Sequence, residues 1–236
     1  MKKTLRRLTP RPILHLYNRI VSRAKIGRLY GAEFDLEWKR RAKDADLSLW
    51  RHTYDSSWEN FAQGDLSPFD LEKLGELVPP GVSILDAGCG DGVLLESLAG
   101  KNRKLFGIDL STTALKLATV RLKGGASFTG GMLESLPFQD KSFDVVFTTH
   151  TLEHVQNLKA AVSELQRICR NRLVIVVPIQ EYLPYTEDYH ISFFPTEEDL
   201  RRQILLPGAT IERSSGLRGD VWLLWRDFGA QAKIPA

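Results

Sequence analysis

The chain has 236 residues, of which 43% are hydrophobic and 26% are charged, and these proportions are typical of a globular domain with a buried core. No run approaches the roughly 18 apolar residues that a helix needs to cross a bilayer. The two cysteines, Cys89 and Cys169, form neither a disulfide framework nor the ligand spacing of a metal site. The composition therefore argues against membrane-spanning and disulfide-rich classes, and we expect a reducing, cytoplasmic compartment and no bound metal.

Positive charge is concentrated at the N-terminus. Residues 1–30 contain nine Lys and Arg and no Asp or Glu, so the rest of the chain has a net charge of −6 although the whole has +3. The core is thus mildly acidic, and nucleic acid is an unfavourable partner for it. Within the arm, Ile13, Leu16, Tyr17 and Ile20 follow the spacing of one helix face. Such a basic amphipathic helix either packs on the domain, lies on an anionic membrane or lipid substrate, or serves as an organelle-targeting segment.

Residues 31–66 are rich in aromatic side chains and separate the basic arm from the regular pattern that follows. The aromatic residues are Trp38, Trp50, Tyr54, Trp58 and Phe61. We interpret residues 1–66 as an arm and helical cap, and residues 67–236 as the main domain. Ser67 followed by Pro68 is typical of a helix N-terminus, and this helix is predicted to extend through Leu77.

From residue 82 onward, apolar strands and helices alternate along the chain. Strands are predicted at 82–86, 105–109, 127–128, 143–149 and 173–177. Near-continuous apolar strands between helices indicate a parallel sheet covered on both faces, whose ligand lies at the carboxyl ends of the strands. The tail differs, because Thr210–Arg213 and Val221–Arg226 flank a turn that contains Gly and Ser, which predicts an antiparallel hairpin. We therefore predict a doubly wound α/β fold.

A glycine-rich turn follows the first strand of this sheet. The sequence from Leu85 is Leu-Asp-Ala-Gly-Cys-Gly-Asp-Gly, so the three glycines are each separated by one residue, unlike the dinucleotide pattern Gly-x-Gly-x-x-Gly. Glycine lets the backbone approach a ligand closely, and the helix that begins behind the turn presents unpaired N–H groups. Asp86 would repel a pyrophosphate but attract a cation. The turn therefore favours a ligand that carries positive charge and no phosphate.

This turn resembles the first motif of the class I S-adenosylmethionine-dependent methyltransferases, whose cofactor is a sulfonium with a free amino group and no phosphate. The resemblance implies a Rossmann-like, doubly wound sheet of seven strands, mostly parallel, with an antiparallel C-terminal hairpin and an N-terminal helical extension. Asp109 ends the second strand, where a carboxylate can accept both hydrogen bonds of a ribose diol. The residues predicted to bind S-adenosyl-L-methionine are Asp86, Gly88, Cys89, Gly90, Gly92, Asp109, Leu110, Met132, Leu133 and Thr149.

The adenine end of the predicted cofactor site departs from the family pattern. Many relatives have an acid where Met132 stands, and the resemblance implies that this acid accepts a hydrogen bond from the adenine amino group. Backbone groups of Met132 and Leu133 can still read the ring edge, and the resemblance places Leu110 against the adenine. We expect the loss of one hydrogen bond to weaken binding by about 0.5–1.5 kcal/mol.

Three histidines follow the fourth and fifth strands. His150 is near the end of the fourth strand, while His154 belongs to a Leu-Glu-His-Val stretch that resembles a family signature and is interpreted as structural. In relatives a loop after the fifth strand carries a histidine near the active site, which makes His190 the second candidate. Because imidazole has a near-neutral pKa, it can act as a base toward a hydroxyl group. His150 and His190 are therefore the predicted catalytic residues.

The resemblance implies transfer of a methyl group, and we expect a small-molecule or lipid-linked acceptor that is methylated on oxygen. In relatives the region that corresponds to residues 31–66 often covers the substrate pocket, an alternative here to ordinary helix packing. The Tyr and Phe side chains of residues 178–194 suit an acceptor with ring or apolar character. Two alternatives stay open, namely methylation of an RNA or protein recruited by the basic arm, and cofactor binding without catalysis. Residues 1–30 are the predicted place of any peripheral membrane contact.

Overall fold

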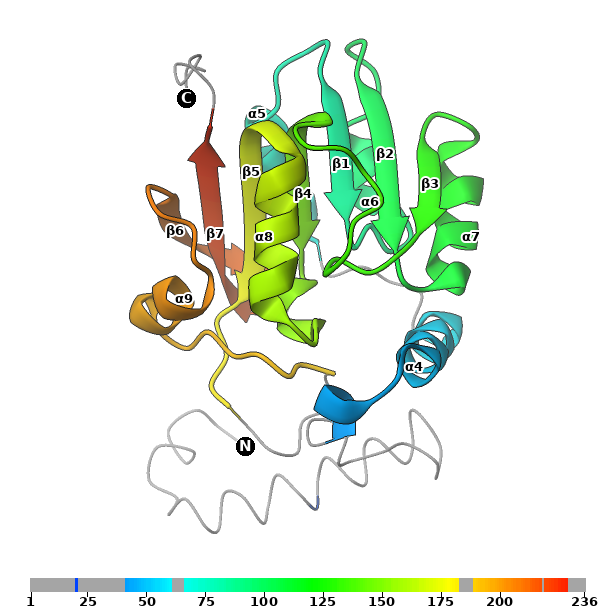
Figure 1. Cartoon of the computed structure of the whole chain (residues 1–236). Helices are drawn as coiled ribbons and strands as arrows, with labels where there is room; N and C mark the ends of the chain where they lie inside the picture. The colour runs from blue at the N-terminus through cyan, green and yellow to red at the C-terminus, as the bar shows by residue number, and fades with distance from the viewer. Residues whose placement is uncertain (1–19, 21–40, 61–65, 183–188, 218, 229–236) are drawn as a thin grey trace.

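In the computed structural model of this chain, the described residues are 20, 41–60, 66–182, 189–217 and 219–228. A seven-stranded sheet lies at the centre, in the order β3-β2-β1-β4-β5-β7-β6 (Figure 1). All neighbouring strands are parallel except those that pair with β7, which is antiparallel to both β5 and β6. The strands are β1 (Ser83–Ala87), β2 (Lys104–Asp109), β3 (Ser127–Gly130), β4 (Phe143–Thr149), β5 (Cys169–Pro178), β6 (Thr210–Gly216) and β7 (Gly219–Asp227).

Six α-helices and two short 3-10 helices are found among the described residues. They are η1 (Ala42–Asp44), α4 (Leu47–Asn60), α5 (Pro68–Glu76), α6 (Val93–Ser97), α7 (Thr112–Leu122), η2 (Leu152–His154), α8 (Leu158–Ile168) and α9 (Glu197–Gln203). Ser67 and Asp70 form a reciprocal capping box at the start of α5, as expected from the Ser-Pro signal. None of the described helices is both long enough and apolar enough to span a bilayer.

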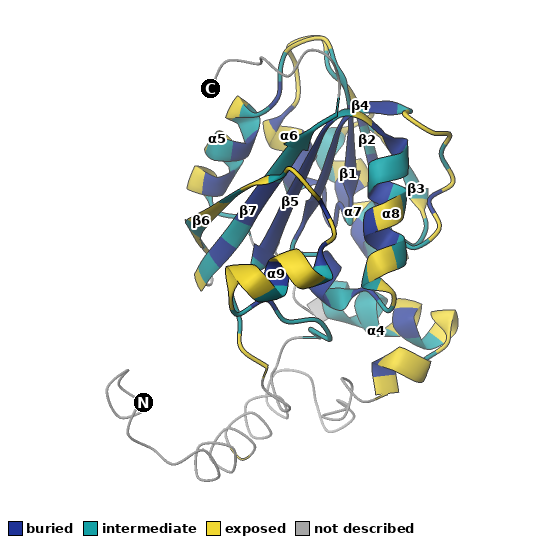
Figure 2. Cartoon of the chain, turned by 60° about the vertical axis from the view of Figure 1, so that its left-hand side comes forward, coloured by how far each residue is buried: buried dark blue, intermediate teal, exposed yellow. Residues whose placement is uncertain are grey.

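Two hydrophobic cores lie on the opposite faces of the sheet. One contains Leu74 of α5 and Leu94 and Leu95 of α6, and the other contains Leu165 of α8 and Leu200 of α9. Between them the central strands β1, β4 and β5 are buried almost throughout, while the edge strands β3 and β6 are partly exposed (Figure 2). The predicted doubly wound sheet with an antiparallel C-terminal hairpin is therefore confirmed.

Strand β5 is longer than its apolar run, which predicted only residues 173–177. It begins at Cys169 and includes Arg172, a buried charged residue. The Arg172 guanidinium forms two hydrogen bonds with the carboxylate of Asp227, which lies opposite it on β7. Pairing across the sheet thus admits a charge that the hydrophobic pattern of a single strand does not predict.

The basic arm lies almost entirely outside the described residues. The helix predicted through Ile13, Leu16, Tyr17 and Ile20 therefore remains a prediction, although Ile20 itself is helical and 60% exposed. Helix α4, by contrast, is described and lies below the carboxyl ends of β1 and β2 (Figure 1). The carboxylate of Asp55 holds it there by accepting hydrogen bonds from the Ser111 hydroxyl and the Thr113 N–H at the start of α7.

Candidate active site

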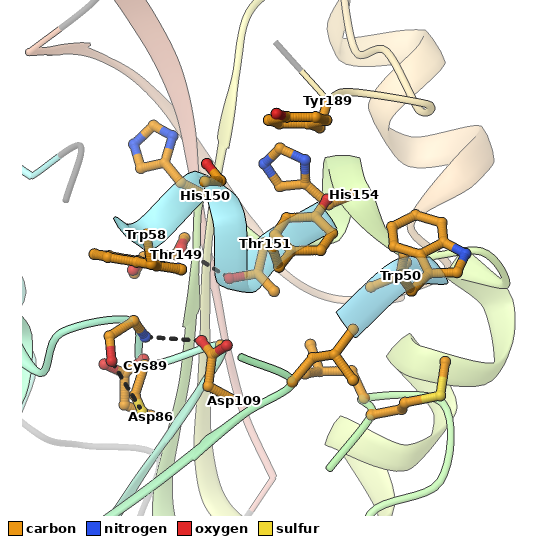
Figure 3. A pocket seen from close by; sticks show the side chains of 18 of the residues that line it. Trp50, Trp58, Asp86, Cys89, Asp109, Thr149, His150, Thr151, His154 and Tyr189 are labelled. Carbon is orange, nitrogen blue, oxygen red and sulfur yellow. Dashed lines mark hydrogen bonds between the residues drawn. The ribbon is translucent and has the colours of Figure 1, made fainter. Parts of the chain in front are cut away.

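A cavity of about 280 Å³ lies between the carboxyl ends of the parallel strands and α4. Its wall combines the glycine turn, the ends of β2 and β4, the segment after β3, η2 and the loop at Tyr189 (Figure 3). Nine of the ten residues predicted to bind the cofactor line it, and both predicted catalytic histidines do so as well. The tenth, Gly92, caps α6 with a φ of 80° directly behind the turn.

Two glycines of the turn leave space that other side chains occupy. A Cβ atom on Gly88 would lie 2.2 Å from the Thr151 Oγ1 atom, and one on Gly90 would lie 2.6 Å from the ring of Trp58. Both residues also have a positive φ, which side-chain-bearing residues rarely adopt. The turn can therefore pass between η2 and α4 only because these positions have no side chain.

Asp86 places a carboxyl group with an unsatisfied oxygen at the floor of the cavity. Its side chain is 2% exposed, and its Oδ1 atom has no hydrogen-bond partner among the described residues. Burial, together with the negative charges of Asp109 and Asp91, raises the pKa of Asp86 to about 8. A cationic ligand would compensate for both the burial and the neighbouring charges. The floor of the cavity is thus suited to bind positive charge.

Asp109 holds the glycine turn in place from the end of β2. Its Oδ2 atom accepts a hydrogen bond of 2.9 Å from the Gly90 N–H, and its Oδ1 atom accepts one of 2.8 Å from the Ser111 N–H. Burial raises the pKa of Asp109, although these backbone hydrogen bonds partly oppose the increase. Each carboxylate oxygen has a second lone pair, so hydroxyl groups of a ligand could bind without breaking these contacts.

Aromatic side chains of α4 form another wall of the cavity. Trp50 and Tyr54 stack with their ring centroids 5.6 Å apart, and the Trp50 indole donates a hydrogen bond to the Ala42 carbonyl. Trp58 lies over the glycine turn. These three residues thus line the cavity, and their role toward a substrate stays a prediction. The other two aromatic residues of that segment, Trp38 and Phe61, lie outside the described residues.

The two candidate bases, His150 and His190, both lie close to the carboxylate of Glu153. The Nδ1 atom of His150 is 3.7 Å from Glu153 Oε1, and the Nε2 atom of His190 is 3.9 Å from that same oxygen. His150 has a φ of 51°, and its N–H is fixed to the Val176 carbonyl. The sequence does not predict this shared partner, because His190 comes from a different loop.

Some residues of the cavity were not predicted from the sequence. The Glu134 carboxylate accepts a hydrogen bond from the Gln156 N–H, and the Gln156 amide in turn donates to the carbonyls of Ala42 and Ala45. This chain of contacts joins η1 to the segment after β3. Neither Glu134 nor Gln156 belongs to a sequence pattern that marks it as a site residue. His150, Glu153 and His154, by contrast, lie within five residues of one another.

The sheet order, the glycine turn after β1 and the acids that end β1 and β2 define the fold of a class I methyltransferase. Residues 85–177 match the family model described as "Methyltransferase domain". Over this stretch the chain is similar to the class I, S-adenosylmethionine-dependent methyltransferases, which confirms the predicted resemblance.

Relatives with assigned functions match part of the chain. The chain is 32% identical over 111 residues to a "Ubiquinone biosynthesis O-methyltransferase" of Thiobacillus denitrificans, covering 45% of this chain and 48% of the relative. It is 30% identical over 145 residues to a "Demethylmenaquinone methyltransferase" of Lactococcus lactis, covering 57% of each. The chain therefore spans about half the length of these relatives, and the similarity does not extend to their entire lengths.

A solved structure supports the fold over a larger part of the chain. The magnesium protoporphyrin IX methyltransferase (ChlM) from Synechocystis PCC 6803, solved with bound SAH, has a TM-score of 0.60 at 17% identity. The match covers 78% of this chain and 100% of that structure. At this level of identity the similarity establishes the arrangement of the strands and helices and leaves the acceptor open.

Proposed function

We propose that this protein transfers a methyl group from S-adenosylmethionine to a small-molecule acceptor. The observation that carries the proposal is the buried Asp86 carboxyl at the floor of the cavity, one oxygen of which has no hydrogen-bond partner among the described residues. Because Asp109 and Asp91 add negative charge around it, a cationic cofactor fits this floor and an anionic dinucleotide does not. When bound, the sulfonium supplies an already activated methyl group.

The residues predicted from the sequence have distinct tasks in this proposal. Asp86 attracts the positive charge of the cofactor, and Asp109 accepts hydrogen bonds from its ribose hydroxyls. Leu110, Met132 and Leu133, which line the cavity, contact the adenine. The glycine turn, with Cys89 and Thr149 on the cavity wall, encloses the methionine portion of the cofactor. Orientation of the acceptor behind the methyl group can contribute about 7–11 kcal/mol to catalysis.

The acceptor in this proposal carries a hydroxyl group on a ring or an apolar body. Trp50 and Tyr189 give the cavity an aromatic wall on the side away from Asp86 (Figure 3), and Tyr54, which stacks on Trp50, lines the cavity as well. His150 and His190 are the candidate bases for removing the hydroxyl proton. The names of the two quinone-pathway relatives are consistent with such an acceptor.

Residues 1–30 are proposed to bring the protein to an anionic membrane when the acceptor is lipid-linked. Their nine basic residues and the absence of acidic ones support this role. Deleting residues 1–30 should abolish sedimentation with vesicles that contain phosphatidylserine, while the affinity for the cofactor stays the same. Vesicle binding that survives the deletion would contradict the role of the arm.

Calorimetric titration with S-adenosylmethionine tests the cofactor site directly. Asp86→Asn and Asp109→Asn should each weaken binding about 10- to 100-fold, because each removes a charge-assisted interaction. Glu72→Gln, at an exposed position of α5, is the matched control and should bind as the wild type does. Undiminished affinity in both Asp variants would overturn the cofactor assignment.

Transfer of a labelled methyl group to fractions of a host lysate tests the activity. We expect label in a small organic-soluble product, and we expect His150→Ala to reduce kcat with little change in cofactor affinity. Label in RNA or protein would favour the recruitment alternative, and cofactor binding without any labelled product would favour a non-catalytic role.

A further inference from the structure

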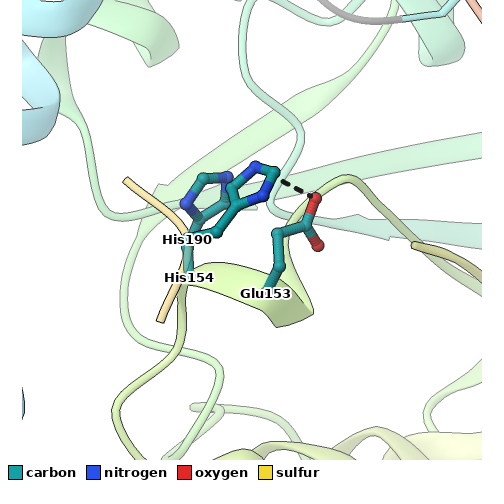
Figure 4. Close-up of side chains that lie close together, drawn as sticks. All are labelled: Glu153, His154 and His190. Carbon is teal, nitrogen blue, oxygen red and sulfur yellow. Dashed lines mark ion pairs between the residues drawn. The ribbon is translucent and has the colours of Figure 1, made fainter. Parts of the chain in front are cut away.

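Glu153, His154 and His190 bring one carboxylate and two imidazoles together at the wall of the cavity (Figure 4). One ligand atom from each residue lies within 4.8 Å of the other two. The rings of His154 and His190 meet edge to face with their centroids 4.7 Å apart. Both histidines line the cavity, whereas Glu153 lies behind them.

Glu153 is the feature of this cluster that most needs a cationic partner. The residue is 0% exposed, and neither carboxylate oxygen has a hydrogen-bond partner among the described residues. A buried carboxylate without such contacts is unfavourable by several kcal/mol unless a cation lies against it. Within the described ranges, the potentially cationic groups that act on Glu153 are the imidazoles of His150, His154 and His190.

The surroundings of the cluster already orient His190 toward Glu153. The Nδ1 atom of His190 is hydrogen-bonded to the side-chain oxygen of Gln180, which leaves Nε2 directed at Glu153 Oε1. A histidine that binds a metal normally donates its second ring N–H to an oxygen in this way. The N–H groups of Ile191 and Ser192 also donate to the Glu153 carbonyl, so the loop is fixed to η2.

We propose that Glu153, His154 and His190 bind a divalent first-row transition-metal ion of the Zn²⁺ type. Two imidazoles and a carboxylate favour such an ion over Mg²⁺ or Ca²⁺, which prefer oxygen ligands. Ligand atoms around Zn²⁺ lie about 3.4 Å apart when the bonds are about 2.1 Å long, so the three atoms need to move inward by roughly 1 Å. Three protein ligands leave one coordination position open, and it would face the cavity.

This assignment differs from the sequence-based expectation that the chain holds no metal. It stands on the geometry of three side chains and does not depend on methyl transfer. If the protein also acts as proposed above, His190 is a ligand and His150 remains as the candidate base. The open position would then suit an oxygen of the acceptor, a consequence that rests on the proposed function.

Metal binding by the full-length protein, purified and stripped with a chelator, tests the site. We expect one Zn²⁺ per chain by calorimetry, and we expect added Co²⁺ to give the intense visible absorption of a four-coordinate site. His190→Ala should weaken binding at least about 100-fold, and Gln180→Leu, which removes the supporting contact to His190 and leaves the three ligands in place, about 10- to 100-fold. His52→Ala, at an exposed position of α4, is the control and should bind normally.

The circular dichroism spectrum of each variant distinguishes loss of a ligand from loss of the fold, and Gln180→Leu provides a milder test than the ligand variants. Less than one equivalent of tight binding by the wild type would overturn the proposal and favour a protonated imidazole as the partner of Glu153. Equal binding by the wild type and His190→Ala would overturn it as well. Titration with S-adenosylmethionine in the same samples reports separately on the cofactor site, so that the two proposals can fail independently.

Discussion

Replacing Asp86 with Asn tests whether the floor of the cavity holds a carboxyl group whose ionisation opposes folding. Burial, reinforced by Asp109 and Asp91, raises its pKa from 3.8 to about 8. In the unfolded chain the same carboxyl ionises near its ordinary value, so between these two pH values the unfolded state has lost a proton that the folded state retains. The stability of the cofactor-free protein should therefore fall as the pH rises through this window, and this contribution should level off above pH 8.

The size of this effect follows from the shift in pKa. Between pH 5 and pH 8 the shift lowers the free energy of unfolding by at most about 4 kcal/mol, because each pH unit within the window contributes about 1.36 kcal/mol. Protein interiors respond to charge with an effective dielectric constant of about 20, which reduces the penalty. We therefore expect the stability of Asp86→Asn relative to the wild type to increase by about 1–2 kcal/mol between pH 5 and pH 8.

Urea unfolding of the cofactor-free protein at several pH values, followed by circular dichroism, provides the measurement. The wild type, Asp86→Asn and the exposed control Glu72→Gln are compared, and only the Asp86 variant should gain stability relative to the wild type with rising pH. Parallel profiles for the wild type and Asp86→Asn would refute the reasoning, because Asp86 would then ionise as it does in water. The selection of a cationic ligand by this floor would lose its basis.

Three further perturbations test the surroundings of the site. Gly88→Ala should destabilise the protein by about 1–3 kcal/mol in thermal or urea unfolding, because its Cβ atom would meet Thr151 and its φ is positive; an unchanged midpoint would show that the turn can relax. Ser67→Ala should lower stability by about 1 kcal/mol through loss of the α5 cap, and Ser67→Thr, which keeps the hydroxyl group, should restore most of it. Burial raises the pKa values of Cys89 and Cys169, so both should resist iodoacetamide until urea unfolds the chain, and rapid native labelling would contradict their burial.

The local pattern of the sequence was sufficient for most of the fold. Strands β1, β2 and β4 and helix α8 follow the apolar spacing closely, because that spacing reflects which side of each element is buried. The predicted ends of an element differ from the observed ones where a long-range contact determines them. The start of β5 is an example, since Arg172 is accommodated there through its pairing with Asp227 and its hydrogen bond to the Leu77 carbonyl.

The sequence by itself determined the alternation of strands and helices and the chemical character of the glycine turn, because strand spacing, glycine positions and the acids that follow strands are properties of neighbouring residues. It placed Asp86 and Asp109 at one edge of the sheet for the same reason. Only the tertiary structure decided that one Asp86 oxygen has no partner within the described part of the chain, that α4 covers the turn, and that His190 reaches Glu153 from another loop. These features depend on burial and on contacts between segments that are distant in sequence. The periodicity of a single segment carries no information about either.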